Sequence, residues 1–233
     1  MQAWESEALW SSLQVAVVTV TLCTPLAVSI SYALARWCGP GSWILDSLVL
    51  LPAALPPVVI GYILLAGLSP ASAFGHWLQQ GTGWHLRFFP DGVVLAASAA
   101  TLPMMVRQLR PHFDTLAPQH ALALATLGAS PWQVWRQLWL PRLAPGILSA
   151  VCLGLALAWG ESGATLVLGF ALLPPGSQSY AGTVPLALVQ ALQSPDTLDA
   201  AARLAGLSCL IVLAALLASE ALRRHGLQRA ALP

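Results

Sequence analysis

Lysine is absent from this 233-residue chain, and all ten of its basic residues are arginine. A Walker A phosphate-binding loop requires a lysine, so the chain cannot itself be an ATPase of that kind. Enzymes that form a Schiff base through lysine are excluded for the same reason. No catalytic residues are expected in the chain, and it is not expected to be an enzyme.

Charge is also scarce. Charged residues make up 8% of the chain and hydrophobic residues 57%, whereas a soluble domain carries about a quarter charged residues. Such a chain cannot cover a water-facing surface, so membrane lipid is its expected solvent. The net charge of +1 excludes nucleic-acid binding by bulk electrostatics.

The four cysteines show no CxxC spacing, and the histidines have no ligand partners at helical spacing. We interpret the cysteines as small apolar side chains. The sequence therefore predicts no metal site and no cofactor bound by this chain.

Five stretches are apolar and long enough to cross a bilayer, whose core of about 30 Å requires about 20 helical residues. They are residues 13–35, 44–68, 92–109, 143–170 and 198–222. We therefore expect an all-α, polytopic membrane protein whose residues 1–233 form a single transmembrane domain.

The arginines predict the orientation. With the N-terminus outside and the C-terminus in the cytoplasm, eight of the ten arginines lie on the cytoplasmic side, as the positive-inside rule requires. Asp199 and Arg203 then lie outside, where a spacing of four residues would let them pair on a helix.

Prolines interrupt the second apolar stretch, "LLPAALPPVVIGYILL". Pro52, Pro56 and Pro57 each remove a backbone donor from the expected helix. A broken backbone is tolerated at membrane depth where protein or a water-filled path satisfies the freed carbonyls. A simple packing kink and a broken helix that lines a path both remain open.

Glu161 is the acid well inside an expected span, in "AWGESGAT". An acid in the membrane is a functional candidate. Its carboxylate would, however, repel any transported substrate that is an anion. Its role could be structural or gating, it could contact substrate, or it could be a buried protonated acid. Ser162 and Thr165 are candidates for polar lining, and Gly163 permits a close helix approach.

The segment "LGASPWQVWRQLWLP" carries its own helix signals. Ser130 and Gln133 fit a capping box, and Pro131 occupies the first helical position. We expect the helix to end near Leu138, before Pro141. Trp132, Trp135 and Trp139 would share one face of an amphipathic surface helix.

An upstream helix would end at Gly128 in a left-handed conformation. On physical grounds this helix–turn–helix unit, within a cytoplasmic loop of residues 114–142, is either an interfacial linker or a docking element for a cytosolic subunit.

The run "LGASPWQVWRQLWLPRLAPGI" resembles the EAA loop of ABC-transporter permeases. Gly128, Leu138, Leu140 and Pro141 match that motif's spacing. The Glu-Ala-Ala part falls on Ala121 to Leu124, where there is no glutamate. In this family the loop is the coupling helix, seated in a cleft of the ATPase subunit.

The resemblance implies contacts with that subunit for a set of residues in and near the loop: Ala123, Leu127, Gly128, Ala129, Ser130, Pro131, Leu140 and Pro141. For the translocation path or gate, the candidates taken from the spans are Pro56, Pro57, Glu161, Ser162, Gly163 and Thr165.

Three further runs, "ILDSLVLLPAALPPVVIGYILL", "LPMMVRQLR" and "GESGATLVLG", resemble the molybdate importer permeases. This resemblance implies the type I importer permease fold in a bacterial or archaeal cytoplasmic membrane. It also implies a homodimer, two cytosolic ABC ATPase subunits that bind ATP and Mg²⁺, and an external oxyanion-binding protein.

Other functions remain open. Tungstate or sulfate could replace molybdate as the substrate of such an importer. A secondary, ion-coupled transporter would require titratable groups in several spans and usually repeated halves. A membrane scaffold would not require the proline breaks or the capped docking unit.

Overall fold

The computed structural model describes residues 3–230, except 38, 40, 84–87, 115–125, 127, 129, 173–181 and 194–196. Within those residues every regular element is a helix. Four long helices form a bundle: α1 (Ala3–Arg36), α5 (Val93–Asp114), α8 (Leu140–Gly160) and α11 (Leu198–Ala230). The shorter elements are α2 (Ser42–Ala54), α3 (Pro57–Leu68), α4 (Ala73–Thr82), η1 (Phe88–Gly92), α7 (Pro131–Val134), η2 (Trp135–Trp139), α9 (Gly163–Leu172) and α10 (Val184–Ala191).

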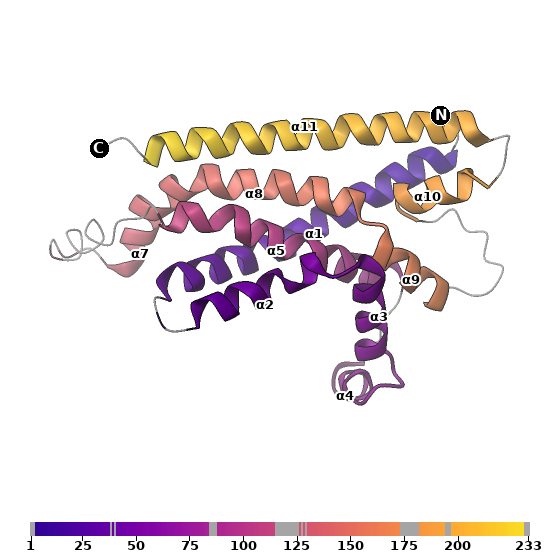
Figure 1. Cartoon of the computed structure of the whole chain (residues 1–233), viewed down its shortest axis with the longest axis horizontal. Helices are drawn as coiled ribbons and strands as arrows, with labels where there is room; N and C mark the ends of the chain where they lie inside the picture. The colour runs from indigo at the N-terminus through magenta and orange to yellow at the C-terminus, as the bar shows by residue number, and fades with distance from the viewer. Residues whose placement is uncertain are drawn as a thin grey trace.

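The bundle is held together by small residues. Helix α1 packs against α5 and α8, and α11 lies along α8 (Figure 1). At Gly154 of α8, an added Cβ would lie 2.9 Å from the sulfur of Met105 on α5 and 3.1 Å from Val20 on α1. Close approach through small residues is how helices associate in lipid, where apolar burial gives little driving force.

The bundle has two distinct ends. Figure 1 shows α7 and the C-terminus at one end, which we call the coupling end. Helices α3, α9 and α10 lie toward the opposite end, which we call the far end. Helix α5 ends and α8 begins near the coupling end, and α7 lies there as well.

The number of spans agrees with the prediction. Among the described residues, four helices are long and apolar enough to cross a membrane, or five if α2 and α3 count as one bent span. The bend between α2 and α3 is 101°, so the second span is a broken helix and not a kinked one. Leu55 and Pro56 each precede a proline, which disfavours helical backbone, and both are extended, with ψ of 145° and 134°.

The fourth span differs from its predicted form. Residues 143–170 were expected to form one continuous helix, but α8 ends at Gly160 and α9 begins at Gly163. Glu161 has an extended backbone, with φ −68° and ψ 124°. No proline lies at this break, and the hydrogen bonds of Glu161 described below stabilise it instead.

The expected helix end near Leu138 is also wrong. The helical backbone continues from α7 through the π-helical turn η2 into α8. In η2 the backbone N–H of Leu140 donates to the carbonyl of Trp135, five residues earlier. This wider turn lets the helix continue past Pro141. The proline ring and its missing backbone donor would disrupt an ordinary α-helical turn.

The spacing of four residues suggested that Arg203 pairs with Asp199. Arg203 pairs instead with a residue of α1. Its Nη2 donates to Oε1 of Glu5 at 2.9 Å, and Glu5 is 1% exposed. The pair ties the start of α1 to the first turns of α11 at the far end.

Candidate functional site: a coupling segment and a double break

The first region is the coupling segment, defined here as Gly128–Pro141. Gly128 has φ +87°, the left-handed conformation predicted for it. The backbone N–H of Gln133 donates to Ser130 Oγ at 3.3 Å, and the N–H of Ser130 donates to Gln133 Oε1 at 2.7 Å. The capping box is therefore confirmed, and the helix begins at Pro131 as predicted. Ala123, Leu127 and Ala129 lie outside the described residues.

Two tryptophans of this segment are packed against other aromatic rings, and the third is exposed. Trp139 lies 5.9 Å from Trp135 and 5.7 Å from Tyr32 on α1, measured between ring centroids. The guanidinium of Arg36 lies 5.1 Å from the Trp139 ring, a cation–π contact. Trp132, by contrast, is 66% exposed. Trp139 therefore fixes the segment to α1 with Trp135 packed against it, while Trp132 in the first turn is exposed.

The second region is the double break, defined here as Leu55–Pro57 together with Glu161–Gly163. An added Cβ on Gly163 would collide with Pro57, so the first residues of α9 and α3 touch. One turn further on, an added Cβ on Gly61 would lie 2.8 Å from the Cβ of Val167. Helices α3 and α9 therefore start side by side and run in the same direction.

A carboxylate caps the start of α9. Glu161 Oε1 accepts from the backbone N–H of Ala164 at 2.9 Å, and Oε2 accepts from the hydroxyl of Thr165 at 2.5 Å. A negative charge at a helix N-terminus is stabilised by the partial positive charge of the free amides. Glu161 is therefore engaged by the chain's own donors at the break.

The start of α3 has no such cap. Pro56 precedes the helix without a side-chain hydrogen bond, and Pro57 has no backbone donor. Val58 and Tyr62 are 59% and 65% exposed. The two breaks are adjacent, but only the one in the fourth span carries an acidic cap.

The structure thus brings together several of the predicted path residues. Pro57 contacts Gly163, Glu161 bonds Thr165, and Thr165 is 1% exposed. Pro56 is exposed, and Ser162 supplies the carbonyl that accepts from Leu166 N–H at 2.9 Å. Leu140 and Pro141 lie exposed in the first turn of α8.

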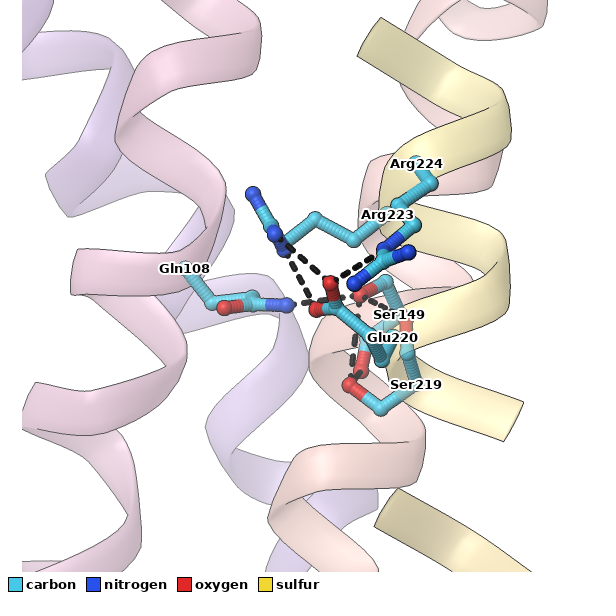
Figure 2. Close-up of polar contacts among 6 residues, drawn as sticks. All are labelled: Gln108, Ser149, Ser219, Glu220, Arg223 and Arg224. Carbon is cyan, nitrogen blue, oxygen red and sulfur yellow. Dashed lines mark hydrogen bonds and ion pairs between the residues drawn. The ribbon is translucent and has the colours of Figure 1, made fainter. Parts of the chain in front are cut away.

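One polar network was not predicted. Gln108 on α5 donates from Nε2 to Ser149 Oγ on α8 at 2.7 Å. Ser149 and Ser219 on α11 each donate from Oγ to the other's carbonyl at 2.8 Å. We call these three residues the serine lock (Figure 2). Its sequence signal was a serine inside each of two apolar runs, but the partner lies 70 residues away.

Comparisons with known proteins agree with this architecture. Residues 24–219 match the family described as binding-protein-dependent transport system inner membrane component. The molybdenum transport system permease protein ModB of Escherichia coli K12 is 35% identical over 226 residues, covering 97% of this chain and 96% of that protein. The sulfate transport system permease protein CysT of the same organism is 31% identical over 176 residues, covering 72% and 62%.

A solved structure shares the fold. A chain from the crystal structure of a bacterial alginate ABC transporter, in complex with its alginate pentasaccharide-bound periplasmic protein, superposes with a TM-score of 0.66 at 15% identity. The alignment covers 97% of this chain and 80% of that one. The chain therefore belongs to the family of binding-protein-dependent transport system inner membrane components, the membrane-spanning permeases of ABC importers.

Proposed function

We propose that the chain is the permease subunit of an ATP-driven importer that moves molybdate across the cytoplasmic membrane. The assignment of molybdate as the substrate rests on the 35% identity of this chain with a molybdenum permease over nearly the whole of both chains. The match to the sulfate permease CysT is lower in identity and covers only 62% of that protein. Tungstate, which has the charge and shape of molybdate, would be expected to follow the same route.

The partners belong to this proposal. Since the chain contains no lysine, ATP and Mg²⁺ would be bound by two cytosolic ABC ATPase subunits that dock on the coupling segment. An external oxyanion-binding protein would deliver the substrate. The permease itself would work as a homodimer, with two copies around a central path.

The described geometry supports a mechanical link between docking and gating. Helical backbone runs without interruption from Pro131 to Gly160, a length of about 45 Å at about 1.5 Å per residue. The next residue, Glu161, caps α9, and α9 packs on α3. A displacement of the coupling segment by the ATPase would therefore move the double break through one rigid element.

The same geometry suits the passage of a dianion. A tightly binding cationic site midway would hinder release, and the double break offers no arginine. The start of α3 has no acidic cap, so the partial positive charge of its helix N-terminus stays unneutralised, whereas at α9 the Glu161 carboxylate already accepts from Ala164 N–H and Thr165. Because Glu161 is engaged in capping, its proposed role is to position α9 and not to bind substrate.

The exposed surface of the bent span supports the homodimer. Helices α2 and α3 expose a row of large apolar side chains: Trp43, Ile44, Leu48, Leu51, Val58, Tyr62 and Ile63. Figure 1 shows α3 projecting away from the four-helix bundle. A second copy would cover part of this surface, and lipid the remainder.

The orientation remains the one that the arginines predict, with the N-terminus outside. Cysteines introduced at positions 177 and 229 provide the test, since the account places them on opposite sides. An impermeant thiol reagent added to intact cells should label position 177 and not position 229. Labelling of position 229 alone would reverse the proposed orientation.

Transport itself is tested in proteoliposomes that contain the permease, its ATPase and the loaded binding protein. Uptake of labelled molybdate should require internal ATP, and tungstate should compete more strongly than sulfate. If sulfate were transported and molybdate were not, the proposed substrate would be wrong. ATP-independent uptake driven by an ion gradient would instead indicate a secondary transporter.

A further inference from the structure

A cavity of about 300 Å³ opens near the coupling end, between the exposed faces of α5, α8 and α11. Four of its lining residues are polar or basic: Arg107, Gln108, His112 and Arg223. Three more are apolar: Met104, Pro111 and Leu153. This cavity lies apart from the double break and is not used in the proposed transport mechanism.

The base of the cavity is rigidly built. Gln108, which lines it, belongs to the serine lock that joins α5, α8 and α11. Ser149 and Ser219 are 0% and 4% exposed. His112 is 3% exposed, and its ring packs where an added Cβ on Gly146 would lie within 2.6 Å. The shape of the cavity is therefore set by tight contacts between its three helices.

The cavity carries an excess of positive charge. Arg223 donates to both oxygens of Glu220, at 2.7 and 2.8 Å, and Arg224 donates to Oε1 at 2.7 Å. Figure 2 shows the two guanidinium groups on either side of this single carboxylate. Arg107 is exposed and forms no ion pair with any residue that the structure describes. The cavity lining thus contains two guanidinium groups, of which Arg223 is paired with Glu220 and Arg107 has no carboxylate partner among the described residues.

Arg107 lies near the cytoplasmic end of the expected span of residues 92–109. It lies seven residues before Asp114, the end of α5, a distance of about 10 Å along the helix. A guanidinium group near the end of a span can reach the headgroup layer, where an anionic group would be its counter-ion. The guanidinium group presents paired donors that match phosphate-like oxyanions in a fork geometry.

We propose that this cavity binds a tetrahedral oxyanion group, held by Arg107 with Arg223 beside it. The group has two possible sources, the phosphate of an anionic phospholipid or a free oxyanion in solution. Met104 and Leu153, which lie farther from the coupling end along α5 and α8, add apolar surface that could accommodate lipid chains. Basic cavities between transmembrane helices near the cytoplasmic face are suited to anionic headgroups.

The lipid arm of the test uses the full-length chain, purified in detergent and stripped of lipid. Native mass spectrometry would count the molecules of added phosphatidylglycerol or phosphatidylcholine that remain bound. We expect the chain to retain phosphatidylglycerol preferentially. Arg107→Gln should weaken that binding by about fivefold, the effect of one basic residue at an anionic surface, and Arg107→Lys should weaken it less, because it keeps the charge but loses the fork.

The second arm measures the free oxyanion. Equilibrium dialysis with labelled inorganic phosphate, and separately with labelled molybdate, would use the same lipid-free protein. The matched control is Arg142→Gln, which removes an exposed arginine near the coupling end but outside the cavity. Arg107 is exposed, so its glutamine variant should keep the thermal stability of the wild type.

Each result has a defined meaning. Preferential loss of phosphatidylglycerol in Arg107→Gln supports the proposal with lipid as the source. Binding of phosphate or molybdate that is lost in Arg107→Gln, without lipid preference, supports it with a free oxyanion as the source. If neither arm shows binding, or if Arg107→Gln and Arg142→Gln weaken it equally, the proposal is wrong.

Discussion

The two breaks that form the double break have different physical causes. The break at Leu55–Pro57 follows from covalent structure, since two consecutive residues each precede a proline and are forced out of the helical region. The break at Glu161–Gly163 contains no proline and is stabilised by the hydrogen bonds of one carboxylate and by glycine packing. The first should therefore persist under most substitutions, whereas the second should depend on single side chains.

The largest expected effect comes from removing both prolines. With Pro56→Ala and Pro57→Ala together, residues 42–68 could form a continuous helix, because each proline in a helix interior costs about 3 kcal/mol. We expect the double variant to lose molybdate uptake. Either single variant still leaves one residue before a proline, so it should retain the break and much of the uptake. Equal uptake by the double variant and the wild type would contradict the importance of this break.

Gly163→Ala should have the next largest effect. Its added Cβ would collide with Pro57, and such overpacking costs on the order of 1–3 kcal/mol. Gly160→Ala is the matched control, because no atom lies within 4 Å of a Cβ added there. Thermal unfolding in detergent should show a lower Tm for Gly163→Ala only. If both variants were equally stable, α3 and α9 would not pack as described.

Two substitutions at Glu161 distinguish the contribution of its helix cap from that of its negative charge. Glu161→Ala removes the acceptor for the Ala164 N–H and should cost about 1 kcal/mol, with reduced uptake. Glu161→Gln keeps an acceptor oxygen and should be close to the wild type in stability and uptake. A glutamine variant that was stable but inactive would show that the charge, and not the cap, is what transport needs.

The smallest effect is expected at Ser130, in the coupling segment. Ser130→Ala removes the oxygen that accepts from Gln133 N–H and should cost about 1 kcal/mol at most. The N–H of Ser130 can still donate to Gln133 Oε1, so part of the capping box would survive. ATPase stimulation by the loaded binding protein should fall slightly. Complete uncoupling would mean that the hydroxyl contacts the ATPase directly.

The difference between the two breaks also explains which structural features could be predicted from the sequence. The proline break, the left-handed Gly128 and the capping box depend on residues close in sequence, and local chemistry was sufficient to predict them. The second break was not predicted, because "WGESGATLVLG" contains no proline and Gly163 was interpreted as a site of close helix approach. Its determinants, the cap on Ala164 and the contact with Pro57, appear only once α9 forms and packs on α3.

Features that depend on distant partners were missed for the same reason. Arg203 has an acid four residues away, yet it pairs with Glu5, 198 residues distant. One local feature was also missed: Pro141 predicted a helix end, but the π-helical turn before it accommodates the ring. Ser149 and Ser219 were unremarkable polar residues in apolar runs until α8 and α11 came together.

The central claim is that the coupling segment and the double break move together through one helix. Gly160, at the end of that helix, has open space around it and can carry a spin label. The label would be attached to Gly160→Cys after the four native cysteines are replaced by serine. The distance between labels in the two copies is then measured with and without ATP in the assembled transporter, and again with Gly128→Val added.

Valine at Gly128 would be strained, because φ is +87° there, but a Cβ added at this position has no atom of the described residues within 4 Å, so the fold should survive. We expect that ATP changes the label distance in the parent protein, and that Gly128→Val abolishes both this change and uptake. An unchanged distance in a parent protein that still transports molybdate would contradict the central claim.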